Sequence, residues 1–247
     1  MDKIYASMAT IPSRIPQLET VVNCILPQVD QLNVYLNNFE EVPWFLKDNP
    51  KINIVRSQDE GDRGDAGKFF WSDKVQGYYF TIDDDIAYPP DYVEVMKKGL
   101  DRRGRKCAVG MHGEMYGNEI RHWTRDRQKT YHFYYELEKD TPTCILGTGC
   151  ALYHTDHIDV KPEYFESPNM ADVWFTLICD RQRKFRVVLA HQRGWLQILQ
   201  VPEHQTLWGK TLKYENENPD KISKEVEVIQ ECLPWKGIQD IPIWEHA

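Results

Sequence analysis

The chain has 247 residues, enough for one large α/β domain or two smaller ones, and 41% of them are hydrophobic. A formal net charge of −8 disfavours a protein that coats nucleic acid or an anionic membrane. We expect no transmembrane segment and no signal peptide, because no apolar run reaches about 18 residues and the first residues lack the charged-then-apolar layout. The six cysteines form no CxxC pair, which predicts free thiols, a reducing compartment and a cytoplasmic location.

The first half of the chain alternates strand and helix patterns. Short apolar runs predict strands over residues 3–10, 32–37, 52–56 and 77–83. Apolar residues at helical spacing predict helices over 13–26 and 90–100, with Ser13 and Asp91 as caps, and a polar loop over 60–75 leads into another helix. This alternation favours an α/β fold with a mostly parallel central sheet flanked by helices.

The second half continues this pattern with an interruption. We predict a fifth strand over 106–113, a loop or hairpin insertion over 114–142, an apolar run over 143–155, a helix over 169–183 and a last strand over 185–195. The charged remainder reads as a tail. We therefore expect one domain over residues 1–200 and a C-terminal tail, 201–247, packed on that domain.

Three aspartates, Asp83, Asp84 and Asp85, follow directly after the fourth predicted strand. In open α/β sheets, ligands bind beyond the carboxyl ends of the strands. Adjacent carboxylates repel one another, and a divalent cation such as Mg²⁺ or Mn²⁺ would offset that cost. The alternative interpretation is a solvated acidic turn.

The order of the motifs resembles that of the GT-A fold, nucleotide-sugar-dependent glycosyltransferases (DxD type, family-2-like) over roughly residues 3–200. TIDDDI resembles their DxD motif, ATIPSR their nucleotide-contacting loop, and GDAGKFF the segment whose basic residue approaches the diphosphate. NMADVWF resembles the acidic motif that opens the helix carrying the catalytic base of inverting members. The resemblance implies a single-domain, Rossmann-like GT-A fold, a UDP-sugar donor, a Mn²⁺ or Mg²⁺ cofactor and a carbohydrate acceptor.

The resemblance also assigns roles within the acidic triplet. Asp83 would contact the ribose or base of the nucleotide, Asp85 would ligate the metal, and Asp84 fills the variable middle position. His191 follows the last predicted strand, where such enzymes often supply a further metal ligand. His204 competes for that role, and a structural histidine is the alternative.

Further donor contacts follow from the other motifs. Thr10, Ser13 and Arg14 would lie near the nucleotide, Asp65 and Lys68 would face the donor, and Gly149, with its neighbours Gly147 and Thr148, would leave backbone room for a sugar. Each has a structural alternative. Ser13 and Arg14 suit any helix start, Lys68 suits a solvated helix face, and the glycines suit a strand bulge.

Asp172 is the candidate general base. A carboxylate within hydrogen-bond reach of an acceptor hydroxyl can take its proton as the new bond forms. The start of a helix favours the anionic form, which is also a sufficient structural reason for an aspartate there. Ala171 stands where many inverting relatives carry a second acidic residue.

The sequence also leaves alternative structures for one segment and alternative function classes open. The aromatic stretch over 121–136 would either stack on sugar rings or form a hydrophobic hairpin over the sheet. A sugar-phosphate nucleotidyltransferase is a second function class, although MATIPSRIP lacks the glycines of a phosphate-binding loop. A third is a non-catalytic, metal-dependent carbohydrate- or nucleotide-binding module with a structural Ca²⁺.

Overall fold

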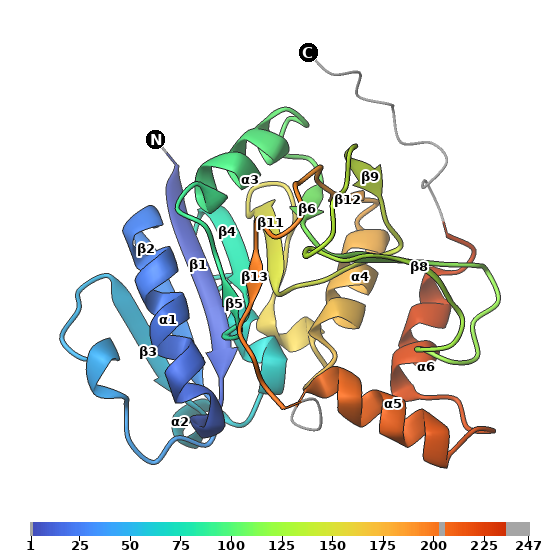
Figure 1. Ribbon diagram of the computed structural model, residues 1–247, viewed down its shortest axis with the longest axis horizontal. Helices are drawn as coiled ribbons and strands as arrows, with labels where there is room; N and C mark the ends of the chain where they lie inside the picture. Colours follow the sequence, from blue (N-terminus) through green and yellow to red (C-terminus); the bar gives the residue numbers. More distant parts are fainter. Residues whose placement is uncertain (1, 203–205, 236–247) are drawn as a thin grey trace.

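A mixed eight-stranded sheet forms the centre of the protein (Figure 1). The computed structural model describes residues 2–202 and 206–235. The strand order is β3-β2-β1-β4-β11-β6-β12-β9. These strands are β1 (Lys3–Thr10), β2 (Gln31–Leu36), β3 (Ile52–Arg56), β4 (Gly77–Ile82), β6 (Ala108–Gly110), β9 (Thr141–Pro142), β11 (Cys150–His154) and β12 (Arg186–Val188).

Two small antiparallel sheets flank the central one. One has the order β10-β7-β8, and the other pairs β13 with β5. Their strands are β5 (Ile86–Ala87), β7 (Gly113–Tyr116), β8 (Arg127–Tyr131), β10 (Ile145–Leu146) and β13 (Gln197–Ile198). The α-helices are α1 (Ile15–Ile25), α2 (Ser57–Glu60), α3 (Tyr92–Asp101), α4 (Ala171–Arg181), α5 (Leu207–Glu217) and α6 (Lys224–Ile229). Shorter 3₁₀ turns include η1 (Pro12–Arg14) and η4 (Gly64–Phe69).

The α/β class is confirmed, but the central sheet is only partly parallel. Strands β3, β2, β1 and β4 run parallel, whereas β11 is antiparallel to both β4 and β6. Strand β9 also runs antiparallel to β12. The apolar run over 143–155 forms β10 in a small sheet, turns at its glycines and enters the central sheet as β11, antiparallel to β4. Its amino end therefore meets the carboxyl end of β4.

Both faces of the central sheet are covered, and alternating residues of each strand serve the two sides. In β4, Tyr78 and Phe80 belong to the core cluster under α1 and α3, whereas Tyr79 belongs to the cluster under α4 and η4. This period of two follows from the strand pleat. Because both sides are buried, the strands read as continuous apolar runs rather than as alternating ones.

Two predicted helix starts differ from the structure. The predicted cap at Ser13 is wrong, because the PSR segment forms the turn η1 and Arg14 is the residue that precedes α1. Asp91 does precede α3, but its side chain makes no cap hydrogen bond and instead accepts one from Trp195 Nε1 at 3.1 Å. The helix expected after the loop over 60–75 is only the short turn η4.

The predicted insertion over 114–142 contains a real hairpin, formed by β7 and β8. The predicted fifth strand divides into β6 and β7. Cys144 and Cys150, expected in one strand, are separated: Cys144 precedes β10 and Cys150 begins β11. All six cysteines are free, as the sequence predicts.

The predicted C-terminal tail contains two helices in its described part, at the opposite end of the protein from β3 (Figure 1). Val226 and Ile229 of α6 share a buried cluster with Val173 and Trp174 of α4. Residues 236–247 lie outside the described residues. Among the described residues, no helix has the length and apolarity that crossing a membrane requires.

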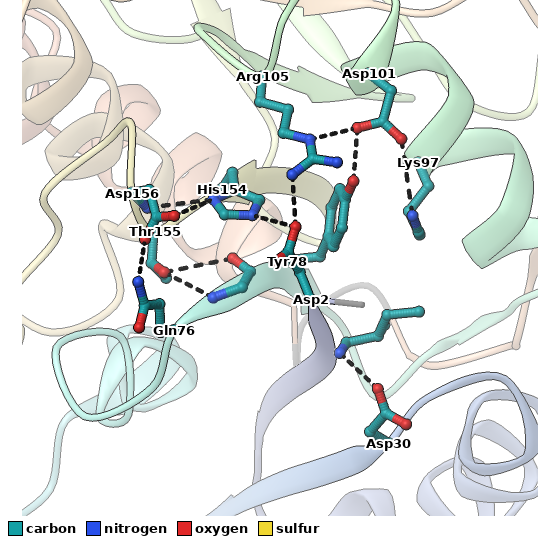
Figure 2. A network of polar contacts seen from close by, with 12 residues as sticks. Asp2, Asp30, Gln76, Tyr78, Lys97, Asp101, Arg105, His154, Thr155 and Asp156 are labelled. Carbon is teal, nitrogen blue, oxygen red and sulfur yellow. Dashed lines mark hydrogen bonds and ion pairs between the residues drawn. The ribbon is translucent and has the colours of Figure 1, made fainter.

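Polar contacts tie together the amino ends of β1 and β4 (Figure 2). Asp101 accepts hydrogen bonds from the Tyr78 hydroxyl at 2.6 Å and from Arg105 Nε at 2.7 Å. Arg105 Nη1 also donates to Asp2 at 2.6 Å, and the Lys97 ammonium lies 3.9 Å from the centre of the Tyr78 ring. These contacts fix the amino ends of β1 and β4, at the opposite end of β4 from the acidic triplet.

Candidate functional site

Segments from distant parts of the sequence meet at the carboxyl end of β4. In the register of the central sheet, Cys150 lies opposite Ile82, so Gly149 reaches the first aspartate of the triplet. The Asp83 backbone N–H lies 3.1 Å from the Gly149 carbonyl and 2.9 Å from the Tyr88 hydroxyl. A Cβ added at Gly149 would lie 2.7 Å from Cγ of Asp83, which is too close for a real side chain. Any larger residue at this position would require the Asp83 carboxylate to move.

A buried lysine holds several carboxylates together. Lys68 of η4 is 2% exposed, and its ammonium donates a hydrogen bond to Asp83 Oδ1. Burial alone would lower the pKa of Lys68, but the nearby carboxylates of Asp83, Asp65 and Asp172 outweigh it and raise the pKa above its usual value. Lys68 is therefore the charged centre of an acidic cluster, and the solvated helix face considered from the sequence is wrong.

Asp65 joins this cluster to the start of α4. Its Oδ2 accepts the backbone N–H of Ala171, the first residue of the helix, at 3.1 Å. Its Oδ1 is buried and has no hydrogen-bond partner among the described residues. Burial raises the pKa of Asp65 to about 6, despite the opposing charge of Lys68. A buried carboxylate oxygen without a partner is one that a ligand hydroxyl or cation can satisfy.

Asp172 is held in place by Thr148. Its Oδ1 accepts hydrogen bonds from the Thr148 backbone N–H at 2.7 Å and from the Thr148 hydroxyl at 2.5 Å. No described residue hydrogen-bonds to Oδ2. Burial is the main cause that raises the pKa of Asp172 above its usual value. Asp172 is thus a carboxylate of raised basicity with one fixed oxygen and one that is available.

The acidic triplet divides between the protein interior and a cavity. Asp84 is 9% exposed, and burial raises its pKa to about 7, an effect that the nearby Thr10 hydroxyl partly offsets. The pKa of Asp85 is raised to about 6 by burial and by the Asp83 charge, and Arg14 Nη1 lies 3.9 Å from its Oδ2. Asp83 and Asp85 both line the cavity. Asp84 is therefore buried in the protein interior, whereas Asp83 and Asp85 face the cavity.

The cavity has a volume of about 990 Å³ and unites the two halves of the chain. Asp65, Asp83, Asp85 and Asp172 line one side of it. The other side is formed by β7, β8 and the start of α5, with a further contribution from the segment 198–202. That segment is attached to the triplet itself, because the Leu199 backbone N–H donates to the Asp85 carbonyl at 2.8 Å.

Two predicted site residues lie apart from this cluster. Ser13 is exposed and makes no polar contact with it in the described chain. His191 is buried, with Nδ1 2.7 Å from the Leu189 carbonyl, and its backbone pairs with Leu137. Among the described residues it neither lines the cavity nor forms a hydrogen bond or ion pair with Asp85. His204 lies outside the described residues.

Sequence reasoning missed the polar group on β7 and β8. Glu114 is 8% exposed, with Arg127 Nη2 at 2.9 Å, the Tyr116 hydroxyl at 2.9 Å and His112 Nε2 at 3.6 Å. Burial, together with the nearby His112 and His191, lowers the pKa of His132 to about 4. The alternation of positions 114 and 116 was the available signal, because those residues share one face of β7, which His112 directly precedes.

The residues fit a divalent cation that takes most of its ligands from a substrate. Among residues 2–202 and 206–235, no group of three or more His, Cys, Asp or Glu side chains is placed to hold a metal ion. Asp83 and Asp85 nevertheless face one cavity, and the Asp83 charge still raises the pKa of Asp85 although Lys68 and Arg14 lie nearby, so the negative charge there is only partly compensated. Mg²⁺ is usually bound by one or two carboxylates, with water and phosphate oxygens completing its shell.

Comparison with known proteins adds no family to this description. No family model matches the chain, and no curated protein is significantly similar to it. The contacts of the site are therefore the basis on which a function is proposed.

Proposed function

We propose that this protein is a metal-dependent glycosyltransferase of the GT-A type. It would transfer a sugar from a nucleotide-diphosphate sugar, a UDP-sugar, to a hydroxyl of a carbohydrate acceptor, with inversion at the anomeric carbon. The observation that carries the proposal is the cluster around Lys68. This cluster brings Asp83 of the triplet together with Asp65 and Asp172. It lies beyond the carboxyl end of β4, and α/β proteins bind ligands beyond the carboxyl ends of their strands.

The charge of the cavity supports metal dependence. Asp65, Asp83, Asp85 and Asp172 line the donor side, and the buried Lys68 offsets only part of their charge. A nucleotide diphosphate is itself strongly anionic, so this surface would repel it. A Mg²⁺ or Mn²⁺ ion held by Asp85, beside Asp83 as a contact to the ribose or base of the nucleotide, would neutralise negative charge that develops on the leaving diphosphate.

Protein residues would supply the remaining donor contacts. Arg14 is 6% exposed, and its Nη1 has no hydrogen-bond partner in the described chain although it lies near Asp85. A buried, unsatisfied guanidinium nitrogen is a natural contact for a phosphate oxygen. Thr10 is buried at the end of β1 near Asp84, and its hydroxyl has no hydrogen-bond partner among the described residues, so it is free to contact the donor. Gly149 allows the chain to approach closely beside Asp83.

Asp172 would act as the general base. Its Oδ1 is fixed by Thr148, so its position does not depend on the substrate. Its Oδ2 is the oxygen left to accept the proton of an acceptor hydroxyl as that hydroxyl attacks the anomeric carbon. Burial raises the pKa of Asp172, which makes the carboxylate a stronger proton acceptor. Lys68 would keep Asp172 ionised at neutral pH.

A screen of nucleotide sugars tests the proposal. Release of free nucleotide from UDP-, GDP-, ADP- and CMP-sugars would be followed with Mn²⁺, with Mg²⁺ and with EDTA. We expect Mn²⁺-stimulated release from a UDP-sugar and none in EDTA. Pyrophosphate release from a nucleoside triphosphate and a sugar phosphate would instead identify a nucleotidyltransferase. Calcium-dependent sugar binding without turnover of any donor would identify a binding module.

The free thiols support a reducing, cytoplasmic location for this activity.

A further inference from the structure

The side of the cavity opposite the acidic triplet is a second polar surface. It consists of Glu114 and Thr130, which face one another across β7 and β8, with Arg127 on β8 and Trp208 on α5. His112 and Trp123 complete this surface, which we call the hairpin wall. Figure 1 shows β8 and α5 on the same side of the protein, away from β1 to β3. None of the roles proposed above uses these residues.

Glu114 is pre-arranged as a hydrogen-bond acceptor at this wall. Arg127 Nη2 lies 2.9 Å from its Oε1, and the Tyr116 hydroxyl lies 2.9 Å from its Oε2. Each carboxylate oxygen has more than one lone pair, so both retain capacity for a ligand hydroxyl. The neighbouring His112 has a buried Nδ1 with no hydrogen-bond partner among the described residues. A nearly buried carboxylate beside an unsatisfied imidazole suits a ligand that has several hydroxyl groups.

Aromatic rings accompany these polar groups. Trp208 lines the cavity and is 40% exposed, although the Arg127 guanidinium lies 4.4 Å from its ring centre. Trp123 also lines the cavity and stacks on Tyr116, with ring centres 5.3 Å apart. A pyranose ring has one face of C–H groups that packs on an aromatic ring, while its hydroxyls point to the ring edge. The combination of exposed tryptophan and buried carboxylate therefore matches a sugar ring.

The charge of the cavity selects among sugars. Arg127 is the single Lys or Arg among the cavity-lining residues of the described chain, and it is already paired with Glu114. His132 is neutral at pH 7, because its pKa is lowered to about 4. The remaining charged lining residues are carboxylates, including Glu225 beside Thr211 on α5. A uronic acid or a phosphorylated sugar would find no free cation at this wall.

The hairpin wall is also directly connected to the candidate base. The Gly147 backbone N–H donates to the His112 carbonyl at 3.0 Å, and a Cβ at Gly147 would lie within 2.9 Å of the His112 ring. The next residue, Thr148, holds Asp172. His112 and the candidate base Asp172 are therefore linked through the consecutive residues Gly147 and Thr148, and both line the same cavity.

We propose that the hairpin wall is the acceptor subsite and that it binds a neutral pyranose, which stacks on Trp208 and hydrogen-bonds to Glu114. The assignment of this sugar as the acceptor rests on the proposed glycosyltransferase function. The preference for a neutral sugar rests instead on the charges of the cavity-lining residues.

Binding of the sugar is measured first, without nucleotide or metal, by isothermal titration and saturation-transfer NMR. The probes are methyl glucoside and methyl galactoside, with methyl glucuronide as the matched anion. We expect the neutral glycosides to bind and the glucuronide to bind at least about tenfold more weakly. Trp208→Ala and Glu114→Gln should each weaken binding of the neutral sugar about tenfold, the loss of roughly one stacking or charged hydrogen-bond contact. Trp208→Phe should restore most of it, and Trp44→Ala, which removes a 75% exposed ring outside this wall, should change nothing.

The catalytic role is then separated from the binding role. In a donor assay, Trp208→Ala should raise the KM for the neutral acceptor about tenfold while acceptor-independent UDP release stays within twofold of the parent. Equal binding of glucoside and glucuronide, or unchanged binding in both variants with parental melting temperatures, would overturn the subsite. If the parent binds neutral glycosides but turns over no nucleotide sugar, the glycosyltransferase function fails and the neutral-sugar site remains.

Discussion

Lys68 and Asp83 form a hydrogen-bonded ion pair between the turn η4 and the carboxyl end of β4. The lysine is almost wholly buried, whereas the Asp83 side chain is 41% exposed to the cavity. The buried Lys68 ammonium therefore holds the cavity-facing carboxylate of Asp83 in a fixed position. Because Asp65 and Asp172 also lie near this ammonium, the charge of Lys68 influences both sides of the proposed reaction.

Removing that cation should destabilise the protein in a pH-dependent way. For Lys68→Met we expect a loss of about 2–3 kcal/mol in the free energy of unfolding at pH 7.5, below the range for a fully buried pair because Asp83 is partly exposed. At pH 5 the loss should shrink, because protonation of Asp65, whose pKa is about 6, removes part of the repulsion. Urea denaturation at both pH values measures this. Lys98→Met, at an exposed pair with Glu94, is the control and should have little effect. An equal loss at both pH values would contradict the role of the cluster.

Gly149→Ala should disturb the acidic triplet directly. The added Cβ would lie 2.7 Å from Cγ of Asp83, so the carboxylate must move. We expect a loss of about 1–3 kcal/mol in stability, as is typical for overpacking, and weaker Mn²⁺-dependent UDP binding. Gly117→Ala is a matched control, since its Cβ would meet only the flexible end of Gln128. Titration calorimetry and thermal melts of the two variants make the comparison. Parental UDP affinity in the Gly149 variant would show that the position of Asp83 does not matter.

Asp85 provides the metal test. Asp85→Ala should abolish Mn²⁺-dependent UDP binding while leaving the fold intact, because one of only two cavity-facing carboxylates of the triplet is removed. Without metal, its melting temperature should equal or exceed that of the parent, since burial and the Asp83 charge disfavour the Asp85 anion. Calorimetry with and without Mn²⁺ measures the binding. Undiminished metal-dependent affinity would exclude Asp85 as a ligand.

Asp84 should produce an unusual dependence of stability on pH. Its pKa is raised to about 7 in the folded protein, against about 3.9 unfolded, so its stabilising contribution is complete below pH 4 and is lost as the pH rises through 7. His132, with its pKa lowered to about 4, acts in the opposite direction between pH 6.5 and 4. The informative quantity is therefore a difference. The free energy of unfolding of Asp84→Asn relative to the parent should increase steadily from pH 5 to pH 8 in chemical denaturation without metal. A flat difference would show that Asp84 titrates normally.

Asp172→Asn separates catalysis from binding. The asparagine oxygen can still accept both hydrogen bonds from Thr148, but the amide nitrogen that replaces Oδ2 cannot take a proton. We expect kcat to fall by about 10²–10⁴-fold, the usual contribution of a general base, while UDP-sugar affinity in Mn²⁺ stays within a few-fold. Thr148→Val, which keeps the backbone N–H, should cause a smaller loss of kcat. Near-parental turnover in Asp172→Asn would show that Asp172 is not the general base and has only a structural role at the start of α4.

The sequence by itself determined the strands β1 to β4, the helices α1, α3 and α4 to within a few residues, and the free thiols. These are local properties, because a short apolar run, an apolar spacing of 3.6 residues and the absence of CxxC pairs can each be recognised within a single segment. The position of Asp83, Asp84 and Asp85 at the end of β4 followed in the same way, since a strand ends where its apolar run ends.

Tertiary structure decided everything that depends on contacts between distant segments. The reversed direction of β11 brings Gly149 to Asp83, and no local pattern encodes a strand direction. Lys68 reads as a solvated helix residue until β4 and α4 bury it among carboxylates. Glu114 and Trp208 meet at one cavity although they are 94 positions apart in the printed chain, because the hairpin and α5 fold against each other. Burial, and with it the raised pKa of Asp84 and Asp172, exists only once those surfaces are assembled.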